Sequence, residues 1–255
     1  MSTPLSVVII TFNEERNIKR CIDSVLKITD DIVIWDSFSS DRTKDICEQL
    51  PVRFFQAAWE GYSTSKNKAT DQARYDWVLS LDADEALSEE LINAIIELQK
   101  EGTQPASFAR LTNYCGHWVR YGGWYPDIKW RIFNRKQVEW VGRIHESLQW
   151  KNQQEQQSTR LLKGDCLHYS FYHIEEHYRQ AEKFVTLMAE ERFKAGKKTN
   201  NLKMLGKPVV RFLRDYFLKA GFLDGKAGWQ IAKVSAHAVY LREHKLKQFW
   251  KAKQS

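Results

Sequence analysis

Apolar and polar residues alternate in blocks along the first hundred residues. Four mostly apolar segments, at residues 5–11, 31–35, 52–56 and 77–81, have the length of buried strands. The segments between them are polar, or carry apolar residues spaced three and four apart, which is typical of helices. Repeated strand–helix alternation favours a parallel sheet with helices on both faces. We therefore predict an α/β fold, with a mostly parallel sheet as the middle of three α/β/α layers.

Residues that commonly cap helices precede two of the predicted helices. Asn13 suits the start of the first helix, and Ser40 or Asp41 suits the start of the second. The expected helical segments are residues 14–28, a segment ending at residue 50, and residues 63–73 and 88–99.

The pattern changes after the first hundred residues. Residues 121–127 are rich in glycine and aromatic side chains, and strands are expected at residues 128–133, 138–141 and 164–169. From about Tyr172 onward the chain is expected to be mostly helical.

The last part of the chain has a basic, amphipathic pattern. Pro208 suits the first turn of a helix whose apolar residues follow the spacing of one helical face. Residues 194–207 are interpreted as a basic linker before it, and a further helix is expected from Lys226 to about Glu243. The apolar face either packs on the core of the chain or lies on a membrane surface.

Charge is distributed unevenly. The net charge is +7, and residues 192–255 hold 16 Lys or Arg against three Asp or Glu. Such a basic segment suits nucleic acid, an anionic membrane surface or an acidic substrate. Acidic residues gathered at strand ends would repel nucleic-acid phosphates unless a cation intervened. We therefore expect an anionic membrane surface as a partner, and no nucleic acid.

The cysteines and the amino-terminal sequence indicate the cellular compartment of the protein. The four cysteines lie far apart and lack the spacing of zinc sites or small disulfide frameworks. No amino-terminal signal is apparent, and the apolar run at residues 7–10 is too short to span a bilayer. We expect reduced thiols and a cytoplasmic location.

Two carboxylates follow the fourth apolar run. Asp82 and Asp84 are one residue apart, so an extended chain would point both to the same side. Thr11 and Asp36 also lie at the carboxyl ends of predicted parallel strands, where open α/β sheets bind ligands. Carboxylate oxygens suit Mg²⁺ or Mn²⁺, which in turn suggests a diphosphate ligand. The alternative is an acidic turn that caps the helix starting near Ser88.

Four motifs occur in order along the chain. They are Val8-Ile9-Ile10-Thr11-Phe12-Asn13-Glu14, Asp36-Ser37-Phe38-Ser39-Ser40-Asp41-Arg42-Thr43, Asp82-Ala83-Asp84 and Gly142-Arg143-Ile144-His145-Glu146. This set resembles the inverting family 2 glycosyltransferases of the Rossmann-like GT-A fold, over roughly residues 5–169. The form of residues 140–146, and residues 221–225 with Gly228, more narrowly resemble bacterial lipopolysaccharide-core enzymes that transfer glucose from UDP-glucose to a heptose.

The resemblance implies residues that bind the UDP-sugar donor. In such enzymes Thr11, Asn13 and Glu14 contact the nucleotide, and Asp36 hydrogen-bonds the uracil or ribose. The alternative for Asn13 and Glu14 is that they stabilise the start of a helix, and the alternative for Asp36 is that it stabilises a turn.

Further donor contacts are implied on the third helix and the fourth strand. Asn67 and Lys66 would contact the donor, and the lysine would offset phosphate charge. A solvated helix face is the alternative for that lysine. Asp82 would hold the ribose or the sugar, and Arg131 would contact the diphosphate or an anionic acceptor.

The resemblance also implies the base and the metal ligands. Glu146 matches the position of the base that removes the acceptor hydroxyl proton, and the alternative is a surface glutamate. Asp84 would bind a divalent cation, Mg²⁺ or Mn²⁺. His168 would be a second ligand, unless it is a structural histidine. His145 would orient Glu146 or the acceptor.

The predicted organisation is a glycosyltransferase domain at residues 1–170 and a helical extension at residues 171–255. Residues 1–100 would form its nucleotide-sugar half and residues 101–170 its acceptor half. The predicted function is metal-assisted, inverting transfer of a hexose, glucose from UDP-glucose, to a lipopolysaccharide inner-core heptose. The enzyme would be peripheral on the inner face of the bacterial cytoplasmic membrane.

Other functions remain open. They include transfer to another cell-surface polysaccharide or glycolipid, and a basic membrane-binding module without catalysis. A nucleotidyltransferase would need a glycine-rich, lysine-bearing loop after the first strand. A glycoside hydrolase would use Asp84 and Glu146 without metal or UDP. The Gln-x-x-Arg-Trp signature of related processive synthases is absent from the chain, which argues against polymer synthesis.

Overall fold

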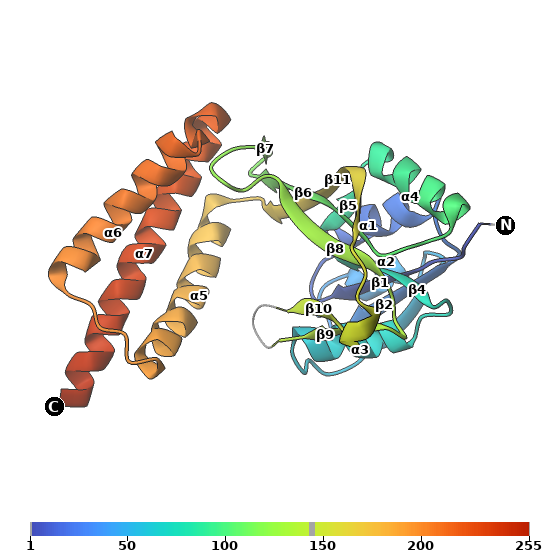
Figure 1. Ribbon diagram of the computed structural model, residues 1–255, viewed down its shortest axis with the longest axis horizontal. Helices are drawn as coiled ribbons and strands as arrows, with labels where there is room; N and C mark the ends of the chain where they lie inside the picture. Colours follow the sequence, from blue (N-terminus) through green and yellow to red (C-terminus); the bar gives the residue numbers. More distant parts are fainter. Residues whose placement is uncertain (1, 143–145, 255) are drawn as a thin grey trace. The chain divides into compact units, whose positions relative to one another are not determined.

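The computed structural model describes residues 2–142 and 146–254, which form two compact units (Figure 1). The first unit contains the residues up to Arg110 together with Asp127–Tyr169. The second contains Leu111–Pro126 and the residues from Ser170 onward. The first unit holds the sheet and the motifs described above, and the second is mainly helical.

The sheet of the first unit begins with four parallel strands. They are β1 (Ser6–Thr11), β2 (Asp31–Asp36), β3 (Arg53–Gln56) and β4 (Trp77–Asp82), in the order β3-β2-β1-β4. Each matches one of the four apolar runs, and β1, β2 and β4 are almost fully buried. The predicted parallel sheet is confirmed.

The sheet continues with strands of mixed direction in the order β8-β6-β11-β5, and β8 pairs with β4 in antiparallel orientation. Their bounds are β5 (Glu85–Leu87), β6 (Ala106–Tyr114), β8 (Asp127–Asn134) and β11 (Arg160–Phe171). A separate hairpin is formed by β9 (Val138–Val141) and β10 (Ser147–Trp150), and the 3₁₀ turn η1 (Gln153–Glu155) follows it.

Helices cover both faces of this sheet (Figure 1). On one face, α1 (Ile18–Val25), α2 (Thr43–Cys47) and α4 (Glu89–Glu101) bury apolar side chains against β1, β2 and β4. On the other face, α3 (Tyr62–Asp71) and the β9–β10 hairpin form a second core. The predicted three-layer α/β/α arrangement is therefore confirmed.

The start of the first helix differs from the prediction. Helix α1 begins at Ile18, whereas Asn13 was expected to cap a helix starting at Glu14. Asn13 has a positive φ of 56°, which is not the extended conformation of a capping residue. Its carbonyl oxygen Oδ1 accepts the N–H of Ser40 at 2.8 Å. Asn13 therefore ties the loops after β1 and β2 together instead of capping α1.

The second unit combines one short strand with three long helices. Strand β7 (His117–Val119) pairs with the end of β6. The helices are α5 (Ile174–Lys194), α6 (Asn201–Leu213) and α7 (Gly225–Gln254), with a π-helical turn η2 (Arg214–Leu218) and a 3₁₀ turn η3 (Gly221–Asp224) between α6 and α7. Helix α7 packs against both α5 and α6 (Figure 1).

Leu111–Pro126 lies in the helical unit, although the sequence prediction placed it in the first domain. The carboxylate of Asp224 explains this placement, because it accepts the N–H groups of Arg120 and Tyr121 at 3.1 and 2.8 Å. Gly122 also donates its N–H to the carbonyl oxygen of Lys219 at 2.9 Å. Such long-range bonds are not visible in the local sequence pattern.

The predicted start of the amphipathic helix at Pro208 is wrong. Helix α6 begins seven residues earlier at Asn201, and the side chain of Asn200 caps it by accepting the N–H of Lys203 at 2.8 Å. Pro208 lies inside the helix. The predicted linker at residues 194–207 is accordingly reduced to the few residues between α5 and α6.

Two glycines allow a close backbone approach between η2, η3 and α7. A Cβ atom on Gly228 would lie 1.8 Å from the carbonyl oxygen of Gly221, and one on Gly221 would lie 2.6 Å from that of Asp215. The residue with a left-handed backbone in this segment is Ala220, with a φ of 54°, which precedes η3. Gly221 is therefore needed for space and not for its φ angle.

None of the helices within residues 2–142 and 146–254 combines the length and the apolar character that crossing a bilayer requires.

Candidate functional site

The ends of the parallel strands bring the predicted site residues together. Thr11 pairs with Asp36 across β1 and β2, and Ile10 pairs with Asp82 across β1 and β4. The prediction that Thr11, Asp36 and Asp82 share one edge of the sheet is confirmed. Because parallel strands end at this edge, their side chains border the region where α/β sheets bind ligands.

Asp82 forms two ion pairs. Its Oδ1 lies 3.0 Å from Nζ of Lys66, and its Oδ2 lies 2.9 Å from Nη2 of Arg131. Burial raises the pKa of Asp82, but the charges and hydrogen bonds of Lys66 and Arg131 outweigh that effect and hold the pKa far below its ordinary value. Asp82 is therefore a fixed negative charge.

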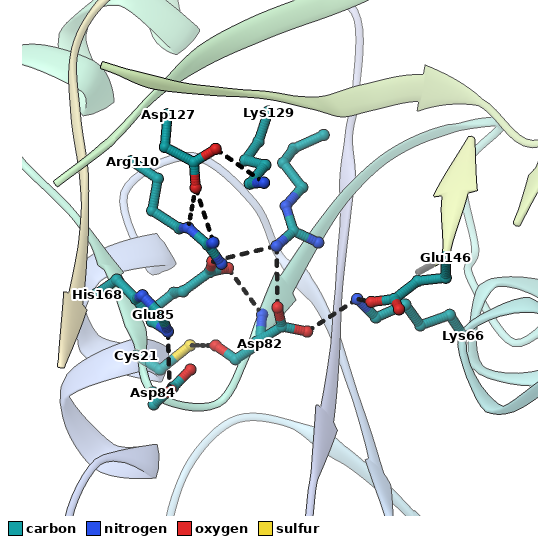
Figure 2. Close-up of polar contacts among 11 residues, drawn as sticks. Cys21, Lys66, Asp82, Asp84, Glu85, Arg110, Asp127, Lys129, Glu146 and His168 are labelled. Atoms are coloured by element: carbon teal, nitrogen blue, oxygen red, sulfur yellow. Dashed lines mark hydrogen bonds and ion pairs between the residues drawn. The ribbon is translucent and has the colours of Figure 1, made fainter. Parts of the chain in front are cut away.

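Lys66 connects Asp82 to the predicted base (Figure 2). Its Nζ also lies 3.0 Å from Oε1 of Glu146, and 4.5 Å from the centre of the Trp140 ring. The lysine is only 1% exposed, so its charge depends on these partners. The alternative of a solvated helix face is wrong for Lys66. Its role toward the donor stays a prediction.

A second ion network lies behind Asp82. The carboxylate of Glu85 contacts Nη2 of Arg131 at 3.1 Å and accepts the N–H of Asp82 at 2.9 Å. Arg110 bridges Glu85 and Asp127, at 3.4 and 2.7 Å (Figure 2). Glu85 and Arg131 are 1% and 5% exposed, so Arg131 orients Asp82 and is not an open diphosphate contact in this structure.

Glu85 and Arg110 were not among the residues predicted from the sequence. An available signal was the apolar residues beside each charge, Ala109 and Leu111 around Arg110 and Ala86 and Leu87 after Glu85, since a charge buried among apolar side chains needs a partner.

Asp84 and His168 form the predicted metal pair. Nε2 of His168 lies 3.1 Å from Oδ2 of Asp84 (Figure 2), and the carbonyl oxygen of Asp84 accepts the N–H of Tyr169 at 2.9 Å. The pairing of β5 with β11 places His168 opposite Glu85 and so brings the two chain segments together. Burial lowers the pKa of His168. The negative charge and the hydrogen bond of Asp84 have the opposite, larger effect, so the pKa of His168 lies above its ordinary value.

The separation of these two atoms fits a shared divalent ion. In octahedral coordination at about 2.1 Å, neighbouring ligand atoms lie about 3 Å apart, close to the observed 3.1 Å. The described residues contain no cluster of three or more His, Cys, Asp or Glu that would hold a metal alone. A small protein ligand set matches Mg²⁺ or Mn²⁺, which commonly complete their shells with water and phosphate oxygens.

Tyr62, at the start of α3, lies near the site carboxylates and was not among the residues predicted from the sequence. Burial raises the pKa of its phenol, and the negative charges of Glu146, Asp82 and Asp84 raise it further. Its ring lies edge-on to Trp59 with the ring centres 4.7 Å apart, and both rings are partly exposed. The phenol is therefore close enough to respond to all three carboxylates. An aromatic pair in a polar segment just before a helix was the available signal.

The residues predicted to contact the nucleotide also support the loops after β1 and β2. Asp36 is fully buried and accepts the N–H and the hydroxyl of Ser39 and the side-chain amide of Gln56. Burial raises the pKa of Glu14 to about 7, and the charges of Asp84 and Asp41 act in the same direction. These contacts fix the loop conformation, and the nucleotide roles of Asp36 and Glu14 stay predictions.

Thr11 has a different environment. Its side-chain hydroxyl is buried at the end of β1 and has no hydrogen-bond partner among the residues that the structure describes. Buried hydroxyls are normally paired, so this one leaves bonding capacity for a ligand or an ordered water.

Asn67 fixes the hairpin next to the site. Its amide group accepts the N–H of Trp140 at 2.9 Å and donates to the carbonyl oxygen of the same residue at 2.8 Å. This reciprocal pair joins α3 to β9, and a donor contact by Asn67 stays a prediction. His145 lies outside the described residues, as do Arg143 and Ile144.

Known proteins are similar to this chain in sequence. The sequence model of Glycosyl transferase family 2 matches residues 6–146. An uncharacterized glycosyltransferase of Rickettsia typhi is 31% identical, over 96% of this chain and 87% of that protein. The lipopolysaccharide core biosynthesis glycosyltransferase LpsC of Rhizobium meliloti is 28% identical, over 96% of this chain and 94% of that protein.

A solved structure was also found to be similar to this chain. The crystal structure of S. aureus TarS in complex with UDP-GlcNAc superposes with a TM-score of 0.47 at 15% identity, and the match covers 97% of this chain and 92% of that chain.

Proposed function

Because the chain belongs to glycosyl transferase family 2, we propose that it transfers a hexose, glucose from UDP-glucose, to a heptose of the lipopolysaccharide core. The transfer is a single displacement that inverts the anomeric carbon. The observation that carries the proposal is the bridge made by Lys66, which lies 3.0 Å from both Asp82 and Glu146. The buried ammonium group of Lys66 thereby sets the spacing between Asp82, on the donor side, and the base Glu146.

Glu146 performs the proton transfer in this proposal. Its carboxylate takes the proton of the acceptor hydroxyl while that oxygen forms a bond to the anomeric carbon. The bond between the anomeric carbon and the diphosphate oxygen breaks, and UDP leaves with the electron pair. General-base assistance of this kind contributes roughly 10²–10⁴-fold to the rate. Glu146 is held for this role by its ion pair with Lys66.

Asp84 and His168 would hold the divalent cation. A cation bound there would offset the negative charge that develops on the departing diphosphate. Asp82, oriented by Arg131, would accept a hydrogen bond from the ribose or the sugar. Thr11 would offer its unpaired hydroxyl to the nucleotide.

The lipopolysaccharide acceptor is supported by the similarity to LpsC, which extends over nearly the full length of both chains. Such an acceptor is lipid-linked. We therefore place the reaction at the inner face of the cytoplasmic membrane.

The proposal is tested with the full chain, Mn²⁺ or Mg²⁺, and core lipopolysaccharide that ends in heptose. UDP-glucose, UDP-galactose and UDP-N-acetylglucosamine are offered separately, and the linkage is determined by NMR. A new β-linked glucose on heptose is the expected product. Absence of transfer from all three donors would refute the proposal, and transfer of another hexose would correct the donor.

The base is tested by Glu146→Gln. We expect donor affinity to persist and turnover to fall by about 10²–10⁴-fold. Glu139→Gln is the matched control, because Glu139 is exposed on the adjoining strand β9. Full turnover in Glu146→Gln would exclude Glu146 as the base.

A further inference from the structure

Large apolar side chains are exposed on one part of the second unit. In the part of the chain that the structure describes, half of the exposed large hydrophobic residues fall within residues 202–229. Helix α6 contains no buried residue at all. We define the apolar stripe as these side chains: Leu202, Leu205, Val209, Val210, Leu213, Phe217 and Leu218, which are between 47% and 83% exposed.

The stripe follows one side of α6. Leu202, Leu205, Val209 and Leu213 are spaced three or four residues apart, so they lie on the same helical face. A different face of α6 meets α7, because Nζ of Lys207 lies 3.0 Å from a carboxylate oxygen of Glu243. The stripe is therefore left uncovered by the helix that packs against α6.

Aromatic side chains extend the stripe onto α7. Trp229 lies with its ring centre 5.1 Å from that of Phe212 and 5.4 Å from that of Tyr216. Phe222 continues the cluster through Tyr216, at 6.3 Å. Trp229 and Phe222 are 49% and 47% exposed, so about half of each of these side chains is accessible to solvent. Aromatic residues with a polar atom favour the boundary between lipid and water.

The exposed charged side chains of residues 192–255 are positive. Residues 192–255 hold 16 Lys or Arg and three acidic residues. All three acidic residues, Asp215, Asp224 and Glu243, are buried and paired with groups of the second unit. Lys203, Lys226 and Lys233 are exposed, and Lys226 and Lys233 share a face of α7 with Trp229. The exposed charge beside the stripe is therefore positive.

We propose that the apolar stripe and its neighbouring lysines dock the protein onto an anionic lipid bilayer surface. Exposed apolar side chains flanked by lysines match the acyl boundary and the anionic headgroups of such a surface. A second copy of the chain would bring its own positive surface against this one, which opposes self-association. The inference rests on the proposed function for its purpose, since a lipid-linked acceptor is met at this surface.

The test is flotation of the full chain with vesicles, without donor or acceptor. Vesicles of phosphatidylethanolamine with phosphatidylglycerol are compared with vesicles of phosphatidylcholine. The wild-type chain is expected to bind the anionic vesicles at least tenfold more strongly than the neutral ones. Equal recovery with both, or no recovery with either, would overturn the proposal.

The stripe variant carries Leu205→Gln, Leu213→Gln and Leu218→Gln. These side chains are 60%, 47% and 83% exposed, so the fold should tolerate the change, and circular dichroism verifies this. The matched control carries Leu26→Gln, Ile128→Gln and Leu161→Gln, which are 42%, 47% and 62% exposed in the first unit. Only the stripe variant should lose binding. Unchanged binding of the stripe variant would overturn the proposal.

The charge variant carries Lys203→Gln, Lys226→Gln and Lys233→Gln. At about fivefold per lysine, binding to anionic vesicles should fall on the order of a hundredfold. The matched control carries Lys19→Gln, Lys100→Gln and Lys136→Gln, at exposed positions of the first unit. This control has the same net charge as the charge variant and should bind anionic vesicles as the wild-type chain does. Equal loss in both triple variants would show that only net charge matters and would overturn the docking surface.

Two further readouts separate the alternatives. Light scattering after size exclusion should show the same mass for the wild-type chain and the stripe variant. A wild-type dimer that the stripe variant abolishes, without vesicle binding, would assign the stripe to a second copy and overturn the lipid proposal. Hydrolysis of UDP-glucose should be unaffected by the stripe substitutions, so failure of docking and failure of the proposed transfer are distinguishable.

Discussion

Lys66 donates a charged hydrogen bond of 3.0 Å to Glu146, although 80 positions separate the two residues in sequence. The bond joins α3 to the residue that precedes β10. Since Lys66 is almost fully buried and also contacts Asp82, removal of its charge should disturb both carboxylates.

Replacing Lys66 with methionine should reduce kcat by about a hundredfold, because Glu146 loses the partner that positions it. Loss of one member of a buried ion pair should also lower the free energy of unfolding by about 3–5 kcal/mol. Steady-state kinetics with separate kcat and KM, together with urea denaturation, measure the two effects. Lys68→Met is the control, since Lys68 lies on the same helix and makes an exposed ion pair with Glu60. Wild-type kcat in Lys66→Met would contradict a positioning role.

Asp84→Asn and His168→Gln should each weaken Mn²⁺ binding by at least tenfold, because each removes one of two side chains that fit a shared ion. Electron paramagnetic resonance of free Mn²⁺ in the presence of UDP gives the affinity without any turnover. Asp23→Asn provides the comparison, as Asp23 forms an exposed pair with Lys19. If both site variants bound Mn²⁺ like the wild-type chain, the assigned pair would not be the metal site.

His177 should make the stability of the chain sensitive to mild acid. Burial lowers its pKa from 6.5 to about 4, and its Nδ1 lies 3.1 Å from the hydroxyl of Tyr114. Between pH 4 and 6.5 the unfolded chain binds more protons at this position than the folded chain. The stabilising contribution is therefore complete above pH 6.5 and is lost as the pH falls toward 4, a change of roughly 3 kcal/mol.

Urea denaturation at pH 7.5 and at pH 5 measures this effect. His177→Phe should reduce the difference between the two pH values, while His237→Phe, at an exposed position of α7, should not. The same pH dependence in His177→Phe as in the wild-type chain would assign the acid sensitivity to other groups.

Gly228→Ala should lower the free energy of unfolding by about 1–3 kcal/mol or more, because its Cβ would overlap the carbonyl oxygen of Gly221. Gly206→Ala is the matched control inside α6, where a Cβ meets nothing within 4 Å. That substitution should leave stability unchanged or raise it by up to about 1 kcal/mol. Thermal melting of both variants checks the difference, and equal melting temperatures would contradict the close approach.

The sheet could be predicted from sequence because its signal is local. Residues 5–11 and 77–81 are mostly apolar, and their strands are buried on both faces. The starts of α1 and α6 could not be predicted equally well. Asn13 is held by Ser40, and α6 begins at a cap, Asn200, that lies inside a segment interpreted as a linker.

The composition of the site was predictable only in part. Asp82, Asp84 and Glu146 stand in motifs, and the family resemblance implied His168. The structure brings each of them into an ion pair with another charged side chain. The burial of Lys66 was not predictable, since its partners come from β4 and from the segment before β10. Tyr62 was missed for the same reason, because the carboxylates around it are distant in sequence.

The chain passes from one compact unit to the other after Arg110, after Pro126 and after Tyr169. Neither unit is consequently a module that a simple truncation could release. A protein ending at Tyr169 would retain Leu111–Pro126 while lacking Phe171, Ala227 and Ile231, which bury Tyr114 and Val119. Recombination between related proteins would preserve this core only if Leu111–Pro126 and the carboxy-terminal helices came from the same parent. The two segments should therefore be inherited together.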